Sequence, residues 1–497
     1  MTDARRLEEV LHGRGLVIAS NRGPVTFERD SEGELSPRRG AGGLVTALTH
    51  VMRQVSGTWV ASAMTAVDRE VVRAQGDEHF ELDANGDSLR LRYLLFERET
   101  FDGYYNRISN WIFWFLMHGM WNLALAPRFD RFTREAWISY QTVNRRYAEV
   151  LAEEVAGRED SAPIMLHDYH LLLTAGFLRE ISPDAFIYHF IHSPWAQPDT
   201  MRILPREMAQ ETLEAMLSND LIGFQTSRWA ANFLRCCEDL LGAKVDWDQR
   251  SVAYGERETL VRQYPISIDV ETLENLVSTE ESSRWDRWVR GVVGDRKLIL
   301  RIDRMELSKN IARGLHAFEE LLHLYPEWRG RVVHMALLYP SRRALYEYRA
   351  YEAEVLDLAD RINSQLGTDD WQPIFVLNED NYVRALTACT SYDVLIVNPI
   401  MDGMNLVAKE GPAVNQKDGV LVLSQNAGAW QELAQGALGI NPYDLSETAE
   451  AIHTALTMDP SERQRRASWL KKVVETNNPT KWMYQQLSDI RRLHEES

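Results

Sequence analysis

Short apolar runs alternate with longer segments of helical periodicity along most of the chain. The expected strands lie at 16–20, 91–96, 163–167, 185–191, 221–225, 297–302, 331–338, 373–377, 393–398 and 420–424. Between them, apolar residues recur at helical spacing in the segments 133–155, 205–218, 228–241, 309–324, 344–366 and 447–457. Several expected strands are continuously apolar, which is typical of strands covered on both faces. The alternation predicts an α/β protein with parallel sheets built from strand–helix–strand units.

A charged segment interrupts this alternation, which begins again at Lys297. We therefore place a boundary near 268–295 and expect two doubly wound domains, residues 1–268 and 269–475. From about Asp459 to Ser497 we expect helices with many Arg and Lys residues, which Pro479 breaks. Open α/β sheets bind ligands at the carboxyl ends of their strands, so we expect both domains to face a common ligand-binding cleft.

The composition is that of a globular protein with an acidic surface. The chain of 497 residues has 55 Lys and Arg against 73 Asp and Glu, a formal net charge of −18, and 45% of its residues are hydrophobic. Because a phosphate backbone selects basic surfaces, this balance argues against nucleic acid as a partner. A local cluster of Arg and Lys is still sufficient to bind a small phosphorylated ligand.

Cysteine usage and the N-terminus predict a cytoplasmic protein. Cys236, Cys237 and Cys389 cannot form a disulfide framework and lack the spacing of a metal site. The N-terminal residues are charged throughout, without the apolar stretch of a signal peptide. Residues 108–127 carry no Asp, Glu, Lys or Arg, but polar residues interrupt them, so we expect a buried core helix and no contact with a membrane.

Two glycine-containing motifs follow the first expected strand. Ser20-Asn21-Arg22-Gly23-Pro24 ends the strand, and Gly40-Ala41-Gly42-Gly43-Leu44 comes after it. An Arg and a glycine-rich turn at the end of a strand can bring a guanidinium and backbone N–H groups to an anion. Two connecting loops whose glycines supply positive φ are the alternative.

Polar motifs also end the next two strands of the first domain. Asp168 lies in LHDYH at 166–170, and His192 lies in FIHSPW at 190–195. At the carboxyl ends of parallel strands these side chains are suited to bind sugar hydroxyls, although a structural histidine is the alternative. A metal site at His167, Asp168 and His170 lacks a second carboxylate cluster to support it.

The second domain carries a basic motif and an acidic one. Arg304 and Lys309, five residues apart after the strand 297–302, could bridge a pyrophosphate, and a solvated basic loop is the alternative. The strand 393–398 leads into a turn at Asp402 and then a helix whose N–H groups suit an oxyanion. Glu410 lies about two turns along that helix, where it can hydrogen-bond a diol.

Taken together, the motifs DGMNLVAKE, HDYHL and SNRGP make the chain similar to the trehalose-6-phosphate synthase family of retaining glycosyltransferases, over about residues 15 to 485. The resemblance implies two Rossmann-like domains facing a cleft, the GT-B architecture. In that scheme, residues 1–268 bind the acceptor, residues 269–475 bind the nucleotide sugar, and a C-terminal helix at 476–497 crosses back to the first domain.

The resemblance also assigns roles to individual residues. Arg304 and Lys309 would bind the donor diphosphate, Asp402 the transferred glucose, and Glu410 the donor ribose. The backbone of Gly403, Met404, Asn405 and Leu406 and the glycine-rich turn at Gly43 would lie beside the donor. Asp168 and His192 would contact sugar hydroxyls near the reacting centre, and the acceptor phosphate would be held by Arg22, Tyr105, Trp114 and Arg342. One departure is Asn310, where the family often has Gly.

The activity implied is transfer of glucose from a nucleotide-diphosphoglucose to glucose 6-phosphate, giving α,α-trehalose 6-phosphate. Arg304, Lys309 and a helix N-terminus can stabilise the leaving diphosphate, so we expect no metal or other cofactor. No covalent nucleophile is evident, which favours a front-face reaction in which the leaving phosphate accepts the proton of the incoming hydroxyl.

Other acceptors and another class of protein stay open at this point. Glycerol 3-phosphate or a cyclitol phosphate could replace glucose 6-phosphate on the same fold. A catalytically silent sensor of sugar phosphates would be expected to lose Arg304, Lys309, Asp402 or Glu410, and all four are present. The sequence does not set the oligomeric state, and a homo-oligomer is compatible with it.

The donor base is expected to lie against the segment after the strand 373–377. Asp380 stands there, where some relatives that use UDP-glucose have an aromatic residue. A carboxylate matches the two parallel donors of guanine, which predicts a preference for GDP-glucose. The alternative is that Asp380 only caps the helix that begins near Asn381.

Overall fold

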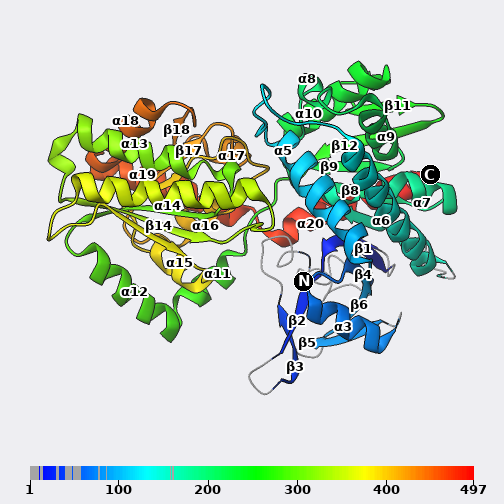
Figure 1. Cartoon of the computed structure of the whole chain (residues 1–497), viewed down its shortest axis with the longest axis horizontal. Coiled ribbons are helices and arrows are strands. Elements are labelled where there is room, and N and C mark those ends of the chain that lie inside the picture. The colour runs from blue at the N-terminus through cyan, green and yellow to red at the C-terminus, as the bar shows by residue number, and fades with distance from the viewer. Residues whose placement is uncertain are drawn as a thin grey trace. The chain divides into compact units, whose positions relative to one another are not determined.

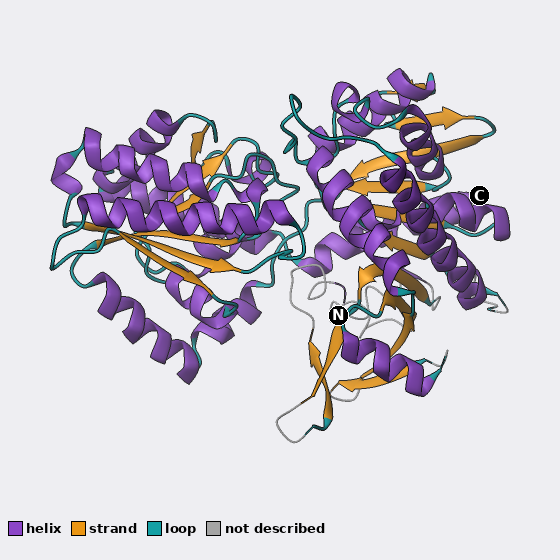
Figure 2. Ribbon diagram, in the orientation of Figure 1, coloured by secondary structure: helices purple, strands orange, loops and turns teal. Residues whose placement is uncertain are grey.

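The computed structural model describes residues 10–11, 15–29, 33–39, 48, 57–76, 79–84, 87–156, 158 and 162–496. The chain divides into two compact units. Unit 1 comprises Met1–Pro265 together with Thr480–Ser497, and unit 2 comprises Ile266–Pro479. Figures 1 and 2 show a strand-built sheet with flanking helices in each unit. The predicted boundary between the domains lies at 268/269, and the chain passes from unit 1 to unit 2 at 265/266. The predicted C-terminal segment begins at residue 476, and the chain returns to unit 1 at residue 480.

Unit 1 contains a ten-stranded sheet in the order β10-β11-β12-β9-β8-β7-β1-β4-β6-β5. Its central strands pair in parallel from β12 to β6, whereas β10, β11 and β5 pair antiparallel at the two edges. The strands are β1 (Leu16–Arg22), β4 (Gly57–Ser62), β5 (Phe80–Ala84), β6 (Asp87–Leu94), β7 (Ile164–His167), β8 (Ile187–Ile191), β9 (Leu221–Phe224), β10 (Lys244–Asp246), β11 (Ser251–Tyr254) and β12 (Arg257–Gln263). A separate antiparallel hairpin joins β2 (Val25–Arg29) to β3 (Leu35–Arg39).

The helices expected in unit 1 at 133–155, 205–218 and 228–241 are present. Polar side chains cap several of them, as where the side chain of Asp130 accepts from the N–H of Thr133 at the start of α6. The longer helices are α3 (Ala66–Gln75), α6 (Arg131–Val155), α7 (Thr174–Ile181), α9 (Arg206–Met216), α10 (Ser227–Cys236) and α20 (Pro479–Glu496). Two shorter ones are α4 (Arg98–Asp102) and α8 (Pro198–Met201).

The charge-free segment at 108–127 is helical only in its first half. A π-helix at Gly103–Phe113 continues into α5 (Trp114–Met117), and the helix ends at His118. The expected buried core helix is therefore correct as far as Met117 and wrong beyond it, because Leu123 and Leu125 are exposed. Within the described part of the chain, no helix is long and apolar enough to span a membrane.

Unit 2 contains a six-stranded, entirely parallel sheet in the order β15-β14-β13-β16-β17-β18. This order reverses direction between β13 and β16, which is the topological switch point of a doubly wound sheet. The strands are β13 (Lys297–Arg304), β14 (Val332–Tyr339), β15 (Ile374–Asn378), β16 (Val394–Val397), β17 (Val420–Ser424) and β18 (Leu438–Ile440).

Helices cover this sheet and bury its apolar strands. They are α11 (Val270–Val277), α12 (Glu280–Val293), α13 (Ile311–Leu324), α14 (Tyr346–Leu366), α15 (Tyr382–Cys389), α16 (Val407–Val414), α17 (Trp430–Leu433), α18 (Leu445–Thr457) and α19 (Pro460–Thr476). On one side, Leu315 and Phe318 of α13 and Ile452 of α18 join strand residues such as Ile299 in a single buried cluster. The charged segment predicted to separate the domains forms α11 and α12 and belongs to unit 2.

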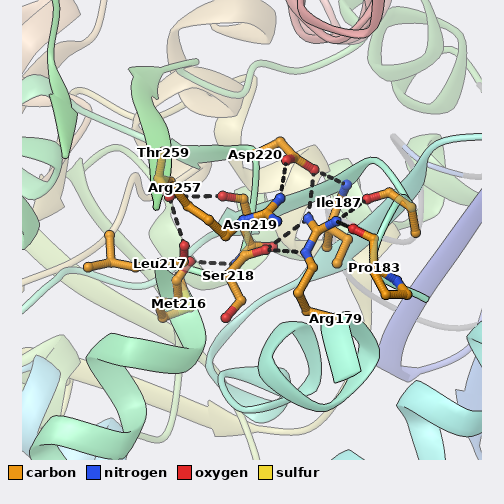
Figure 3. Close-up of polar contacts among 11 residues, drawn as sticks. Arg179, Pro183, Ile187, Met216, Leu217, Ser218, Asn219, Asp220, Arg257 and Thr259 are labelled. Carbon is orange, nitrogen blue, oxygen red and sulfur yellow. Dashed lines mark hydrogen bonds and ion pairs between the residues drawn. The ribbon is translucent and has the colours of Figure 1, made fainter. Parts of the chain in front are cut away.

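At the amino ends of β8, β9 and β12, a polar network joins the strand starts of unit 1 (Figure 3). Asp220 accepts hydrogen bonds from Arg179 and Arg257 at 3.0 Å each and from the backbone N–H of Ile187 at 2.8 Å. Arg179 also donates to the carbonyl of Ser218, and the hydroxyl of Thr259 donates to those of Leu217 and Asn219. The network therefore provides hydrogen-bond partners for the backbone of Ile187 and of residues 217–219.

We expect Asp220→Ala to lower the free energy of unfolding of unit 1 by about 2–3 kcal/mol, because two guanidinium bonds and a backbone bond are lost together. Urea unfolding followed by circular dichroism measures the change. Asp199→Ala is the matched control, since Asp199 pairs with Arg202 in solvent and its loss should cost less than about 0.5 kcal/mol. Equal effects of the two substitutions would contradict the structural role of Asp220.

Candidate functional site

The residues predicted to bind the donor gather at the carboxyl end of the unit 2 sheet. Arg304 is the last residue of β13, and the turn that follows brings Lys309 to Asp402, with the ammonium nitrogen 2.5 Å from Oδ2. The side-chain amide of Asn405 donates to the same oxygen at 3.1 Å. Lys309 and Asp402 are mostly buried, so this ion pair forms a contact between the two motifs that the sequence predicted separately.

Asn310 takes a left-handed backbone conformation, with φ of 59°. Asn is among the few residues other than Gly that adopt this conformation readily, which accounts for the departure from the family pattern. Its side-chain amide donates to the carbonyls of Asn398 at 3.0 Å and Pro442 at 2.7 Å. Asn310 therefore ties the turn after β13 to the segments after β16 and β18.

A fully buried guanidinium lies beneath this turn. Arg301 on β13 hydrogen-bonds the side-chain oxygen of Asn398 and donates to the carbonyls of Lys309 and Asn310 at 3.4 Å. Gly314 on α13 leaves the space, because a Cβ there would lie 2.8 Å from Nη1 of Arg301. Burial raises the pKa of the neighbouring Asp303 carboxyl to about 6, although the positive charges of Arg301 and Lys309 act to lower it.

The turn from Asp402 to Leu406 rests on the loop after β17. The N–H of Gly428 donates to the carbonyl of Asp402 at 3.1 Å, and that of Ala429 to the carbonyl of Met404 at 2.8 Å. A Cβ on Gly428 would lie 1.9 Å from the carbonyl oxygen of Gly403, so only glycine fits there. The turn leads directly into α16, which places the backbone of residues 403–406 at a helix N-terminus.

Glu410 lies on α16 and accepts a hydrogen bond from the hydroxyl of Tyr382 at 3.0 Å. Burial raises the pKa of the Glu410 carboxyl, and the tyrosine bond opposes this. Tyr382 was not among the predicted site residues. Tyr382 begins α15, two residues after Asp380. This closeness to the expected base-binding segment is the one feature of the sequence that could have identified Tyr382 as a site residue.

Asp380 is exposed between β15 and α15 and does not cap the helix. The cap is Asn381, whose side-chain oxygen accepts from the N–H of Arg384 at 2.8 Å. The interpretation of Asp380 as a helix cap is therefore wrong by one position, and its proposed contact with the base stays a prediction.

Arg342, predicted to bind the acceptor phosphate, follows β14 at the same edge of the sheet. Its Nη1 lies 2.7 Å from the hydroxyl of Tyr348 and 3.3 Å from Oε1 of Glu306. Arg304 reaches the same oxygen of Glu306 at 2.9 Å. The arginines predicted for donor and acceptor thus share one carboxylate, which the sequence analysis did not single out because Glu306 stands in a basic motif.

In unit 1, Asp168 and His192 meet at the carboxyl ends of β7 and β8. Oδ1 of Asp168 accepts from the backbone N–H groups of His192 at 3.2 Å and Ser193 at 3.4 Å. Asp168 has φ of 70° and ψ of 174°, a backbone conformation that residues other than Gly rarely adopt. The side chain of Asp168 therefore binds the backbone of His192, so the two predicted residues are in direct contact.

Both ring nitrogens of His192 have neighbours in unit 1. Nε2 lies 3.2 Å from Nδ1 of His167, and Nδ1 lies 3.2 Å from the side-chain nitrogen of Gln225. Burial, together with neighbouring histidines, lowers the pKa of His192 to about 3 and holds that of His167 well below its usual range. Both imidazoles are therefore neutral at pH 7.

The aromatic residues predicted for the acceptor lie near this pair. Tyr105, on the π-helix, stacks on His170 with ring centroids 5.8 Å apart, and Trp114 packs against Tyr169 at 5.4 Å. Arg22 is the exposed last residue of β1. Gly43 lies outside the described residues. The structure thus brings the predicted residues into two groups, one at the carboxyl edge of each sheet.

The described residues contain no group of three or more His, Cys, Asp or Glu placed to hold a metal ion. The cationic groups at the unit 2 edge, Arg304, Lys309 and Arg342, are each paired with a carboxylate. This arrangement suits binding of phosphate groups, because guanidinium and ammonium groups bind phosphate oxygens through charge-assisted hydrogen bonds.

The sequence model of glycosyltransferase family 20 matches residues 14–492, and the chain belongs to this family. An α,α-trehalose-phosphate synthase [UDP-forming] from Pichia angusta is 35% identical over 94% of this chain and 97% of its own length. An E. coli structure bound with UDP-2-fluoro glucose superposes with a TM-score of 0.81 at 28% identity, covering 96% of this chain and 99% of that one.

A second solved structure comes from Burkholderia xenovorans, an α,α-trehalose-phosphate synthase (UDP-forming) in complex with glucose 6-phosphate. It has a TM-score of 0.83 at 27% identity and covers 96% of this chain and 100% of that one. These similarities confirm the family and the fold class predicted from the sequence, an α/β protein with two parallel-sheet domains.

Protonation of the buried histidines of unit 1 should destabilise the protein in acid. Burial lowers the pKa of His189 to about 4 and that of His192 to about 3, whereas an unfolded histidine titrates near pH 6.5. The unfolded state therefore binds more protons below pH 6.5, and stability falls as the pH decreases from about 6.5 toward about 4. Each group contributes a slope of up to about 1.4 kcal/mol per pH unit.

Melting temperatures between pH 7.5 and 4.5 measure this slope for the native protein, His192→Gln and the control His323→Gln. His323 is exposed on α13, so its replacement should leave the slope unchanged. The slope should decrease in His192→Gln, and an unaltered slope in that variant would contradict the assignment.

Proposed function

We propose that this protein transfers glucose from UDP-glucose to glucose 6-phosphate, with retention, and forms α,α-trehalose 6-phosphate and UDP. The observation that carries the proposal is the ion pair of Lys309 and Asp402 beside Arg304, in a chain that belongs to glycosyltransferase family 20. Relatives named as UDP-forming synthases and a related structure holding glucose 6-phosphate support the choice of substrates.

In the proposed donor complex the ion pair exchanges its partners. Lys309 and Arg304 bind the diphosphate, Asp402 accepts hydrogen bonds from the glucose hydroxyls, and Glu410 accepts them from the ribose. Negative charge grows on the leaving oxygen as the bond to the anomeric carbon breaks. The two cations and the N–H groups that precede α16 stabilise this charge.

The acceptor attacks from the side that the diphosphate leaves. A new bond forms between the anomeric carbon and the acceptor hydroxyl oxygen, and the hydroxyl proton passes to the leaving phosphate oxygen. Asp168 and His192 contact sugar hydroxyls, with the imidazole neutral throughout. Arg22, Tyr105, Trp114 and Arg342 hold the acceptor, with the arginines on its phosphate.

GDP-glucose is a second candidate donor, and one observation favours it. Asp380 is exposed and does not cap α15, so the helix does not require its carboxylate. In this proposal the carboxylate binds the base edge of guanine. The UDP-forming relatives favour uridine, and we therefore propose UDP-glucose as the main donor.

The proposed function is tested by crossing UDP-, GDP- and ADP-glucose with glucose 6-phosphate, glycerol 3-phosphate and a cyclitol phosphate. We expect a product with the mass of a disaccharide phosphate from UDP-glucose and glucose 6-phosphate, with the highest kcat/KM of the set. Product from another acceptor alone would overturn the acceptor assignment, and no transfer in any combination would favour a silent sensor.

Asp380→Ala separates the two candidate donors. If the carboxylate hydrogen-bonds guanine, its removal should lower kcat/KM for GDP-glucose by about tenfold to a hundredfold. The kcat/KM for UDP-glucose should not change. Glu379→Ala is the matched control, because Glu379 is a neighbouring exposed carboxylate that pairs with Arg384. An unchanged donor ranking in Asp380→Ala would remove GDP-glucose as a candidate.

Chelation tests whether the side chains alone neutralise the leaving group. Since Arg304 and Lys309 supply two positive charges there, exhaustive treatment with EDTA should change kcat by less than about twofold. Activity that is lost on chelation and restored by Mg²⁺ or Mn²⁺ would show that these two residues do not suffice.

A further inference from the structure

Glu306 is a fully buried carboxylate at the carboxyl edge of the unit 2 sheet, two residues after the end of β13. One of its oxygens, Oε1, is the meeting point of three donors. Arg304 lies 2.9 Å from it, Arg342 lies 3.3 Å from it, and the hydroxyl of Ser341 donates to it at 2.8 Å. The three partners come from two strand ends, after β13 and after β14.

The side chain of Glu306 is an anion at neutral pH. Burial by itself favours the neutral acid, but the charges of Arg304, Arg342 and Lys309 outweigh it and lower the pKa of Glu306 to about 2. A buried carboxylate is stable only while its cations remain in place, because removing one partner leaves an uncompensated charge. The positions of Glu306 and its two arginines are therefore mutually dependent.

The two arginines differ in how they are held. Arg342 is mostly buried, its φ is 40°, and the hydroxyl of Tyr348 accepts from it at 2.7 Å. Arg304 is half-exposed, and its guanidinium forms an ion pair with Glu306. A guanidinium carries five N–H donors in a planar fork, so an arginine that binds a carboxylate can bind a phosphate as well.

We propose that Glu306 is a positioning residue that holds Arg304 and Arg342 side by side, so that the donor diphosphate and the acceptor phosphate are bound as a pair. The inference rests on the proposed function, which gives Arg304 to the donor and Arg342 to the acceptor. Two guanidinium groups that approach each other repel, and the shared carboxylate offsets this repulsion. Neither substrate touches Glu306, yet both depend on it.

This role has a kinetic signature that differs from that of a residue serving one substrate. Glu306→Gln retains the size of the side chain and one acceptor oxygen but loses the charge that orders both guanidinium groups. We expect KM for UDP-glucose and KM for glucose 6-phosphate each to rise by about tenfold or more, since both arginines lose a charge-assisted bond. Glu306→Asp retains the charge on a shorter side chain and should show smaller increases in both values.

The matched control is Glu319→Gln on α13, which removes a carboxylate paired with Arg361 and His316, outside the predicted site. It should leave both KM values unchanged. Arg342→Ala is a second comparison, and it should raise KM for glucose 6-phosphate more than KM for UDP-glucose. Melting temperatures and calorimetric binding of UDP and of glucose 6-phosphate, measured separately, show whether each variant is folded and which ligand it binds weakly.

Parallel losses for both substrates in Glu306→Gln, partly recovered in Glu306→Asp, support the proposal. A loss for one substrate only, or unchanged KM values in a folded variant, overturns it. If Glu306→Gln does not fold, the aspartate variant decides, since values equal to those of the native protein would show that the geometry at Glu306 does not matter. Failure of the native protein to form a disaccharide phosphate contradicts the proposed function instead and is seen before any variant is made.

Discussion

The candidate donor site is built on one buried positive charge, the guanidinium of Arg301. It lies on a central strand, has no exposure to solvent, and hydrogen-bonds the turn that carries Lys309 as well as the side chain of Asn398 at the end of β16. A buried charge is costly unless it is paired and hydrogen-bonded, so the backbone carbonyls around it are held where the guanidinium requires them. The positions of Lys309, Asn310 and, through Asn398, the strand that leads to Asp402 follow from this requirement.

Much of the fold could be predicted because buried parallel strands have a strong sequence signal. All ten expected strands are present, and the six expected helices lie where helical periodicity placed them. The strands β5, β10, β11, β12 and β18 and the hairpin of β2 and β3 were missed, since these strands are short or largely polar and lack a continuous apolar run. The central strand β4 was also missed, because its apolar run, Trp59 to Ala61, is only three residues long. The π-helix at Gly103–Phe113 has no periodicity by which it could be distinguished from an α-helix.

The residues of the candidate site were easier to predict than the contacts between them. Arg304, Lys309, Asp402 and Arg342 were predicted from spacing and resemblance, but their pairing was not. Glu306 lies 35 positions before Ser341 in the sequence, and no local pattern shows that its carboxylate accepts a hydrogen bond from that hydroxyl. The cap of α15 illustrates the same limit at short range, since Asp380 and Asn381 are both good capping residues and only the backbone decides between them.

The ion pair of Lys309 with Asp402 affects which anions can bind at the candidate donor site. A free phosphate that draws the ammonium group of Lys309 away from Asp402 leaves a mostly buried carboxylate without its cation, which opposes binding. A sugar nucleotide brings hydroxyl groups that can hydrogen-bond the released carboxylate while its diphosphate takes the ammonium group. In the proposed donor site, the pair therefore favours a molecule that carries both kinds of group over a simple anion.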